Sequence, residues 1–181
     1  MKNLFCIITL CFATSITVSA QSDWLDFKSV EFAFIAKFPD EPKKSVQEVS
    51  TAIGNIDMHM FMHQPTGADE NVLYSVIRSD YPKEQFEDAD NKYNNNVLDG
   101  AVNGAVTNVS GQLIFDNKIS LNSYPGRNIK IEITEAFIYI NTYLVENIMY
   151  ITQVICMKDK DENKDIKRFM ESFDIIKVKN D

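Results

Sequence analysis

Cysteine is scarce in this chain of 181 residues, which contains only three. Two of them, Cys6 and Cys11, lie in an N-terminal apolar segment, and its removal would leave Cys156 alone. One cysteine cannot form an intrachain disulfide. Cys156 follows Val154 and Ile155 in an apolar run, which predicts a buried thiol that packs like a small hydrophobic side chain.

Basic residues are also few, with 18 Lys and Arg against 26 Asp and Glu, for a net charge of −8. Loss of Lys2 with the N-terminal segment would bring the charge to −9. Nucleic-acid binding needs clustered Lys and Arg, so the composition excludes nucleic acid as a partner. The same negative charge disfavours binding to anionic membrane surfaces.

Long hydrophobic runs are absent apart from the N-terminus. Lys2 precedes a short apolar run, Leu4 to Ala13, and Val18-Ser19-Ala20 has the small residues of a cleavage site. Residues 1–20 are therefore predicted to be a signal peptide that is cleaved near Ala20, which predicts a periplasmic or secreted protein. No second run could span a membrane, so we expect a soluble mature chain.

Proline and glycine number only five and six, so disorder is not favoured. The remaining chain, residues 21–181, is long enough for one domain with one core. Twelve Phe and seven Tyr supply large side chains for that core.

Alternation of apolar and polar residues predicts strands along most of this domain. The predicted strands are Glu31–Phe38, Ser45–Thr51, Asn55–His63, Val72–Ser79, Leu113–Leu121, Asn128–Thr134, Phe137–Val145, Ile148–Cys156 and Phe173–Val178. The second and third of these form a hairpin near Gly54, and the four from Leu113 to Cys156 form a meander joined by short turns.

The period changes after Pro82. Apolar residues recur every three or four positions from Phe86 to Ala105, which predicts a long amphipathic helix. Gly100 and Gly104 fall beside its apolar stripe and are expected to let the helix lie close to a sheet. A second, short helix is predicted at Asp165–Ser172. Together these elements predict an α+β fold, with a mainly antiparallel sheet and one long and one short helix packed on it.

The stretch Tyr124-Pro125-Gly126-Arg127 predicts a type II turn, because proline fixes one φ and glycine can adopt a positive one. A phosphate-binding loop would need more glycines and a following helix. Arg127 remains a candidate for contact with an anion.

Four features in this order resemble exported bacterial proteins of the PsbP-like, DcrB-like fold group. They are the Phe38-Pro39-Asp40-Glu41-Pro42 corner, the hairpin near Gly54, the YPGR stretch and the final RFMESFDI, Arg168 to Ile175. The resemblance covers roughly Trp24 to Val178 and implies an antiparallel sheet between helical layers. It also implies an accessory role, as in the photosystem subunit PsbP, with no catalytic motif to carry over.

The stretch MHMFMH is a candidate for a copper site, because Met and His are soft copper ligands. Its candidate ligands are Met58, His59, Met60, Met62 and His63. On a strand the two histidines would lie about 13 Å apart, since each residue advances about 3.3 Å. The methionines would share the opposite face with Ile56, which is typical of core. We therefore expect no copper, zinc or other metal cofactor.

The stretch DKDENKD places Asp159, Asp161 and Asn163 as in the start of a calcium loop. Lys164 then stands where the loop needs glycine, and Met170 where it needs a bidentate glutamate. A solvated loop before the short helix is the preferred interpretation.

These absences favour a non-enzymatic, exported binding or accessory module with an unknown envelope or extracellular protein as partner. No Gly-x-Ser-x-Gly motif is present, and only two histidines could act as a base. A carrier of small apolar ligands is the alternative, because Met and aromatic side chains could line a pocket between sheet and helix. A hydrolase or copper-binding protein is a weaker alternative.

Overall fold

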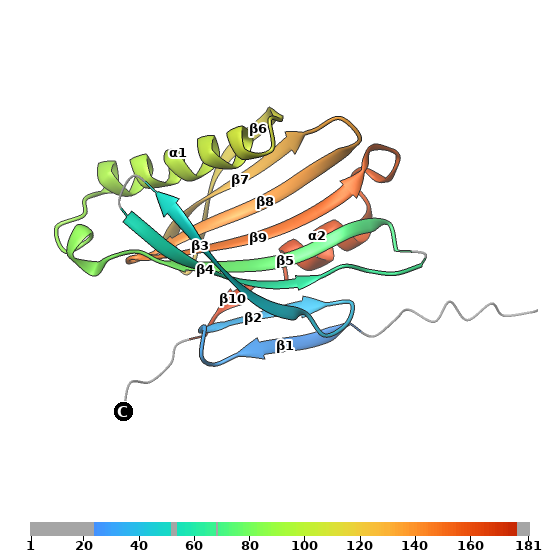
Figure 1. Cartoon of the computed structure of the whole chain (residues 1–181), viewed down its shortest axis with the longest axis horizontal. Helices are drawn as coiled ribbons and strands as arrows, with labels where there is room; N and C mark the ends of the chain where they lie inside the picture. Colours follow the sequence, from blue (N-terminus) through green and yellow to red (C-terminus); the bar gives the residue numbers. More distant parts are fainter. Residues whose placement is uncertain (1–23, 52–53, 68, 177–181) are drawn as a thin grey trace, which may run out of the picture.

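The computed structural model describes residues 24–51, 54–67 and 69–176 (Figure 1). The predicted signal peptide and its cleavage site lie outside these residues. Among the residues described, no helix combines the length and the apolar character that a membrane crossing requires.

Seven antiparallel strands form the main sheet, and most of them follow the alternation seen in the sequence. Across the sheet their order is β3 (Lys43–Thr51), β4 (Gly54–His63), β5 (Asn71–Asp80), β9 (Ile148–Met157), β8 (Ala136–Val145), β7 (Tyr124–Glu132) and β6 (Gln112–Leu121). The hairpin predicted near Gly54 is the β3–β4 pair, and the predicted meander is β6 to β9. The predicted α+β class with a mainly antiparallel sheet is confirmed.

One face of the main sheet is covered by a small sheet and a short helix (Figure 1). The small sheet has the order β1 (Leu25–Ser29), β2 (Phe34–Phe38) and β10 (Asp174–Ile175), and the helix is α2 (Lys164–Met170). Aromatic side chains fill the space between these layers. Phe34, Phe38 and Phe169 are all fully buried there, which explains the aromatic content of the first and last motifs.

The long helix α1 (Asn91–Asn108) lies on the opposite face (Figure 1). It follows a short 3₁₀ turn, η1 (Lys83–Gln85), and begins later than the sequence periodicity predicted. The carboxylate of Asp90 caps it by accepting a hydrogen bond of 2.7 Å from the backbone N–H of Tyr93. Leu98 and Val102 are its buried residues, and they pack on β7, β8 and β9.

The prediction of a strand that begins at Glu31 is wrong, and the predicted strand Glu31–Phe38 is confirmed only over β2, Phe34–Phe38. A turn at residues 30–33 precedes β2, with Ala33 at a φ of 56°, and the sequence reading missed β1 altogether. The register pairs Leu25 with Phe38 and Ser29 with Phe34. The β1 strand is short and mostly exposed, so it lacks the alternation by which a half-buried strand is recognised.

The turn predicted at Pro125-Gly126 is also wrong. The chain reverses three residues earlier, at Asn122 and Ser123, whose φ angles are 50° and 73°. Both central residues at positive φ define a type I′ turn, whose twist suits a two-residue hairpin. Pro125 and Gly126 lie inside β7. Gly126 is required there by close packing, because an added Cβ would lie 2.3 Å from the carbonyl oxygen of Thr142 in β8.

The role predicted for Gly100 and Gly104 is wrong as well. A Cβ at either position would meet no atom within 4 Å. These glycines therefore do not allow close contact between α1 and the sheet. They border an apolar groove between α1 and the main sheet.

Candidate functional site: an apolar groove beside helix α1

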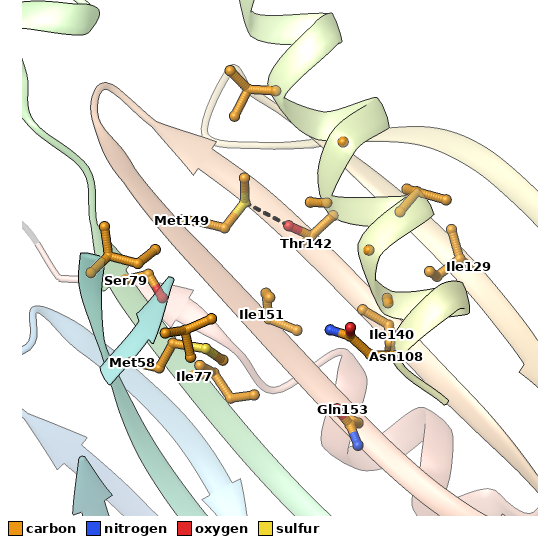
Figure 2. A pocket seen from close by; sticks show the side chains of 18 of the residues that line it. Met58, Ile77, Ser79, Asn108, Ile129, Ile140, Thr142, Met149, Ile151 and Gln153 are labelled. Atoms are coloured by element: carbon orange, nitrogen blue, oxygen red, sulfur yellow. Dashed lines mark hydrogen bonds between the residues drawn. The ribbon is translucent and has the colours of Figure 1, made fainter. Parts of the chain in front are cut away.

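A groove of about 620 Å³ lies between α1 and the main sheet (Figure 2). It forms because α1 packs mainly over β7 and β8, reaches β9 at Met149, and in the described structure leaves the same face of β5 and β4 without a helical cover. We call this space the α1 groove. Its helical wall is made by Val97, Gly100, Ala101, Gly104, Ala105 and Asn108.

The strand wall of the α1 groove comes from alternate residues of neighbouring strands. Met58 of β4 lies opposite Ser79 of β5, and Ile77 lies opposite Ile151 of β9, so these side chains share one face. Gln153 extends the wall along β9. The wall is thus apolar for most of its length, as in pockets that bind small molecules.

One end of the α1 groove is aromatic. Tyr81, Phe86 and Tyr93 come from the segment before α1 and its first turn, and the Phe86 ring centroid lies 5.9 Å from Tyr81 and 5.3 Å from Tyr93. The opposite end carries the side-chain amides of Asn108 and Gln153 (Figure 2). The groove therefore has an amide end and an aromatic end, and Tyr81, Tyr93 and Asn96 add two hydroxyls and an amide on the aromatic side.

Arg127 holds α1 in the position that leaves the groove open. Its guanidinium is buried and forms ion pairs with Asp99 of α1 and with Asp116 of β6, the latter at 3.1 Å. The anions that Arg127 contacts are thus carboxylates of the chain itself. Binding of an external anion by Arg127 stays a prediction that rests on the sequence alone.

The MHMFMH stretch lies on β4, and its two sets of side chains are separated by the sheet. His59 packs on the Phe32 ring with centroids 4.7 Å apart, and Phe61, on the same face, is 3% exposed. This histidine face is the one that enters the aromatic core. Met58, Met60 and Met62 are only half-buried, so the expectation that they form core is wrong.

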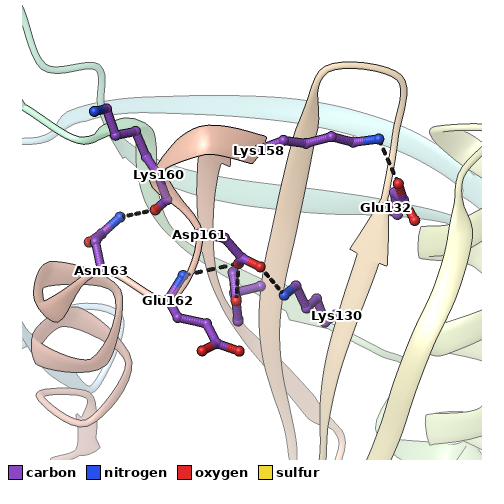
Figure 3. Close-up of polar contacts among 8 residues, drawn as sticks. Lys130, Glu132, Lys158, Lys160, Asp161, Glu162 and Asn163 are labelled. Carbon is purple, nitrogen blue, oxygen red and sulfur yellow. Dashed lines mark hydrogen bonds and ion pairs between the residues drawn. The ribbon is translucent and has the colours of Figure 1, made fainter.

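The DKDENKD stretch holds α2 and its preceding loop against the sheet (Figure 3). Asp161 accepts hydrogen bonds from Lys130 Nζ at 2.7 Å and from the Tyr139 hydroxyl at 2.5 Å. Asn163 caps α2 by accepting from the backbone N–H groups of Asp165 and Ile166. Within the part of the chain that is described, no three His, Cys, Asp or Glu side chains gather as a metal site requires.

The ionisation of this cluster follows from its contacts. Burial opposes charge on Asp161, but the hydrogen bonds from Lys130 and Tyr139 outweigh it and hold the Asp161 pKa below its usual value. Burial also opposes charge on Lys130, and the same contacts reverse that effect and raise its pKa. Burial and the hydrogen bond to Asp161 raise the pKa of Tyr139 to about 12.

Cys156 is buried in β9, as predicted. Burial, with a smaller contribution from the charge of Asp161, raises the pKa of its thiol to about 11. The reactive thiolate is therefore scarce at neutral pH.

These layers define a protein with the PsbP-like fold, an α+β arrangement around an antiparallel sheet. A solved structure with this arrangement is the solution structure of cyanobacterial PsbP (CyanoP) from Synechocystis sp. PCC 6803. The match covers 93% of this chain and 98% of that one, with a TM-score of 0.52 and 12% sequence identity. At this identity the similarity shows the fold alone. No protein-family model matches the chain, and no curated protein matches it.

The α1 groove was not identified from the sequence as a set of residues. A pocket between sheet and helix was anticipated only from the Met and aromatic content. Gly100 and Gly104 were the sequence signal from which the groove could have been predicted. Two glycines beside the apolar stripe of a helix leave a gap wherever no side chain from a strand fills it.

Proposed function

We propose that the protein is an exported, non-enzymatic binding module that carries a small apolar ligand in the α1 groove. The observation that carries the proposal is the groove itself. Its volume of about 620 Å³ falls within the range of ligand pockets, roughly 300 to 1,000 Å³. A filled interface between helix and sheet would have favoured the accessory role instead.

Two further observations support a carrier that performs no catalysis. The Cys156 thiol is buried with a raised pKa, and both histidines of β4 lie beside aromatic rings, His59 at 4.7 Å from Phe32 and His63 at 6.5 Å from Tyr74. The N-terminal segment supports export with cleavage near Ala20, and the mass of the protein recovered from the envelope or medium tests that step.

An accessory role on another envelope or extracellular protein is the second candidate. It is supported by the PsbP-like fold over 93% of the chain. Because one fold hosts many functions, this support is weaker than that of a groove with a defined volume and lining.

Substituting Gly104 with leucine should block the groove. The new side chain would enter space that is empty within 4 Å of the Cβ position. If it excludes about four ligand atoms, at about 0.3 kcal/mol each, binding should weaken roughly ten-fold. Titration of the mature protein with Nile red, an uncharged apolar dye whose emission shifts on binding, measures this change.

Asn103→Leu is the matched control, because residue 103 is exposed on α1 and does not line the groove. This variant should bind the dye as the wild type does. Equal binding by all three proteins would place the dye elsewhere and contradict the proposal. A wild-type dimer that becomes monomeric in the Gly104→Leu variant, without dye binding, would show that a second copy covers the groove.

A further inference from the structure

The α1 groove has a lining without charge. Among the described residues that form its walls, none is an Asp, Glu, Lys, Arg or His. The polar side chains are hydroxyls and amides, and the Thr142 hydroxyl is already engaged with Met149 Sδ at 2.8 Å (Figure 2). A ligand that enters the groove therefore meets no side chain of opposite charge to an ionised group.

The charges around the groove also fail to provide such a partner. Arg127, which reaches α1 from β7, is neutralised by Asp99 and Asp116. Lys92, in the first turn of α1, lies outside the lining and at the aromatic end. The chain as a whole is acidic, with a net charge of −8. An anionic ligand is therefore disfavoured by its surroundings and by the lining.

The amide end of the groove supplies hydrogen bonds of a neutral kind. Asn108 ends α1, and Gln153 lies on β9 opposite Ile140, in the region where Val102 packs. Within the described part of the chain, no hydrogen bond engages either side-chain amide. An amide both donates and accepts, so it suits a hydroxyl or a carbonyl group.

We infer that the α1 groove selects an uncharged amphiphile, with an apolar body and a hydroxyl or carbonyl at the Asn108–Gln153 end. This inference rests on the proposed function, because it specifies the ligand of the same groove. The apolar body lies along the Met58, Ile77 and Ile151 wall, toward the aromatic end. An ionised fatty acid whose apolar chain is as long as that of the uncharged amphiphile is a poor ligand.

Three ligands with the same chain test the selection: decanol, decanoate and decyl chloride. The affinity of each compound is measured by its displacement of Nile red from the full mature protein at about pH 8, where the carboxylic acid is ionised. Decanoate should bind roughly ten-fold more weakly than decanol, because its charge loses hydration without gaining an opposite charge. Decanoate binding within about two-fold of decanol would overturn the inference and leave the proposed function standing.

The amide end is tested with the double variant Asn108→Leu/Gln153→Leu. The ratio of decanol affinity to decyl chloride affinity should fall roughly ten-fold, because only the alcohol loses hydrogen bonds. Asn103→Leu should leave the ratio unchanged. An unchanged ratio in the double variant would overturn the assignment of the amide end. Should that variant fail to fold, the wild-type comparison of decanol with decanoate still decides the inference. If neither the dye nor any ligand binds the wild type, the proposed function falls, and the inference with it.

Discussion

Replacing Gly126 with alanine should lower the free energy of unfolding by about 3 kcal/mol, the upper range for overpacking a core. The added Cβ would lie 2.3 Å from the Thr142 carbonyl oxygen and 2.8 Å from Tyr143 Cδ1. The oxygen belongs to the backbone of β8, which is held by β7 on one side and β9 on the other. The clash can therefore be relieved only by separating two central strands.

Urea denaturation followed by circular dichroism measures this loss. Gly100→Ala and Gly104→Ala are the matched controls, because a Cβ at either site meets nothing within 4 Å. Each should stabilise the protein by about 0.5 to 1 kcal/mol, since alanine favours a helix over glycine. A Gly126→Ala protein as stable as the wild type would show that β7 and β8 are not in such close contact.

Replacing Asp161 with alanine should cost about 3 kcal/mol at neutral pH, because it leaves the Lys130 ammonium buried without its carboxylate. The Lys130 side chain is 9% exposed, and that of Asp161 is 28% exposed. The Tyr139 hydroxyl loses its acceptor as well. Asp159→Ala is the control in the same loop, because that carboxylate is 75% exposed and, among the described residues, pairs only with Lys160, at 3.7 Å. Its effect should be close to zero.

The same variant should change the dependence of stability on pH. The Asp161 pKa is lowered in the folded state, so its stabilisation is present above the unfolded pKa and is lost as the pH falls through the folded pKa. The Lys130 and Tyr139 pKa values are raised, so their stabilisation is present below the unfolded values and is lost as the pH rises through the folded ones.

Wild-type stability should therefore decline below about pH 4 and above about pH 10. The difference between wild type and Asp161→Ala should shrink on the acid side, where Asp161 is protonated. A difference that stays constant from neutral to acid pH would show that Asp161 is not ionised in an ion pair with Lys130. Unfolding curves over this pH range provide the measurement.

The sequence alone determined most of the strands, because alternation with a period of two is a local property of a half-buried strand. The β3–β4 hairpin and the β8–β9 pair follow from it, and so does the α+β class. The short helix α2 and the buried state of Cys156 were also predictable, since each depends on residues that are near in the chain. The resemblance to PsbP-like proteins also rests on local patterns of this kind.

Only the tertiary structure decided what the glycines do and where the site lies. Gly126 is constrained by Thr142, which is on the next strand of the sheet, and the sequence around Gly126 indicates only a turn. The ion pair of Lys130 with Asp161 joins residues 31 apart, and Lys130 had no recognisable pattern of its own. Contacts of this kind arise from strand register, which is not encoded at either residue.

The α1 groove, the candidate functional site, also could not be located from the sequence. Its two walls come from α1 and from β4, β5 and β9, which the chain places far from one another. Whether the sheet face at Met58 and Ile77 is core or groove depends on where α1 packs. That position is set by Leu98, Val102 and the ion pair of Asp99 with Arg127. The sequence determined that this face is apolar, and the packing of one helix decided that it stays open, because burial depends on the elements that meet across space.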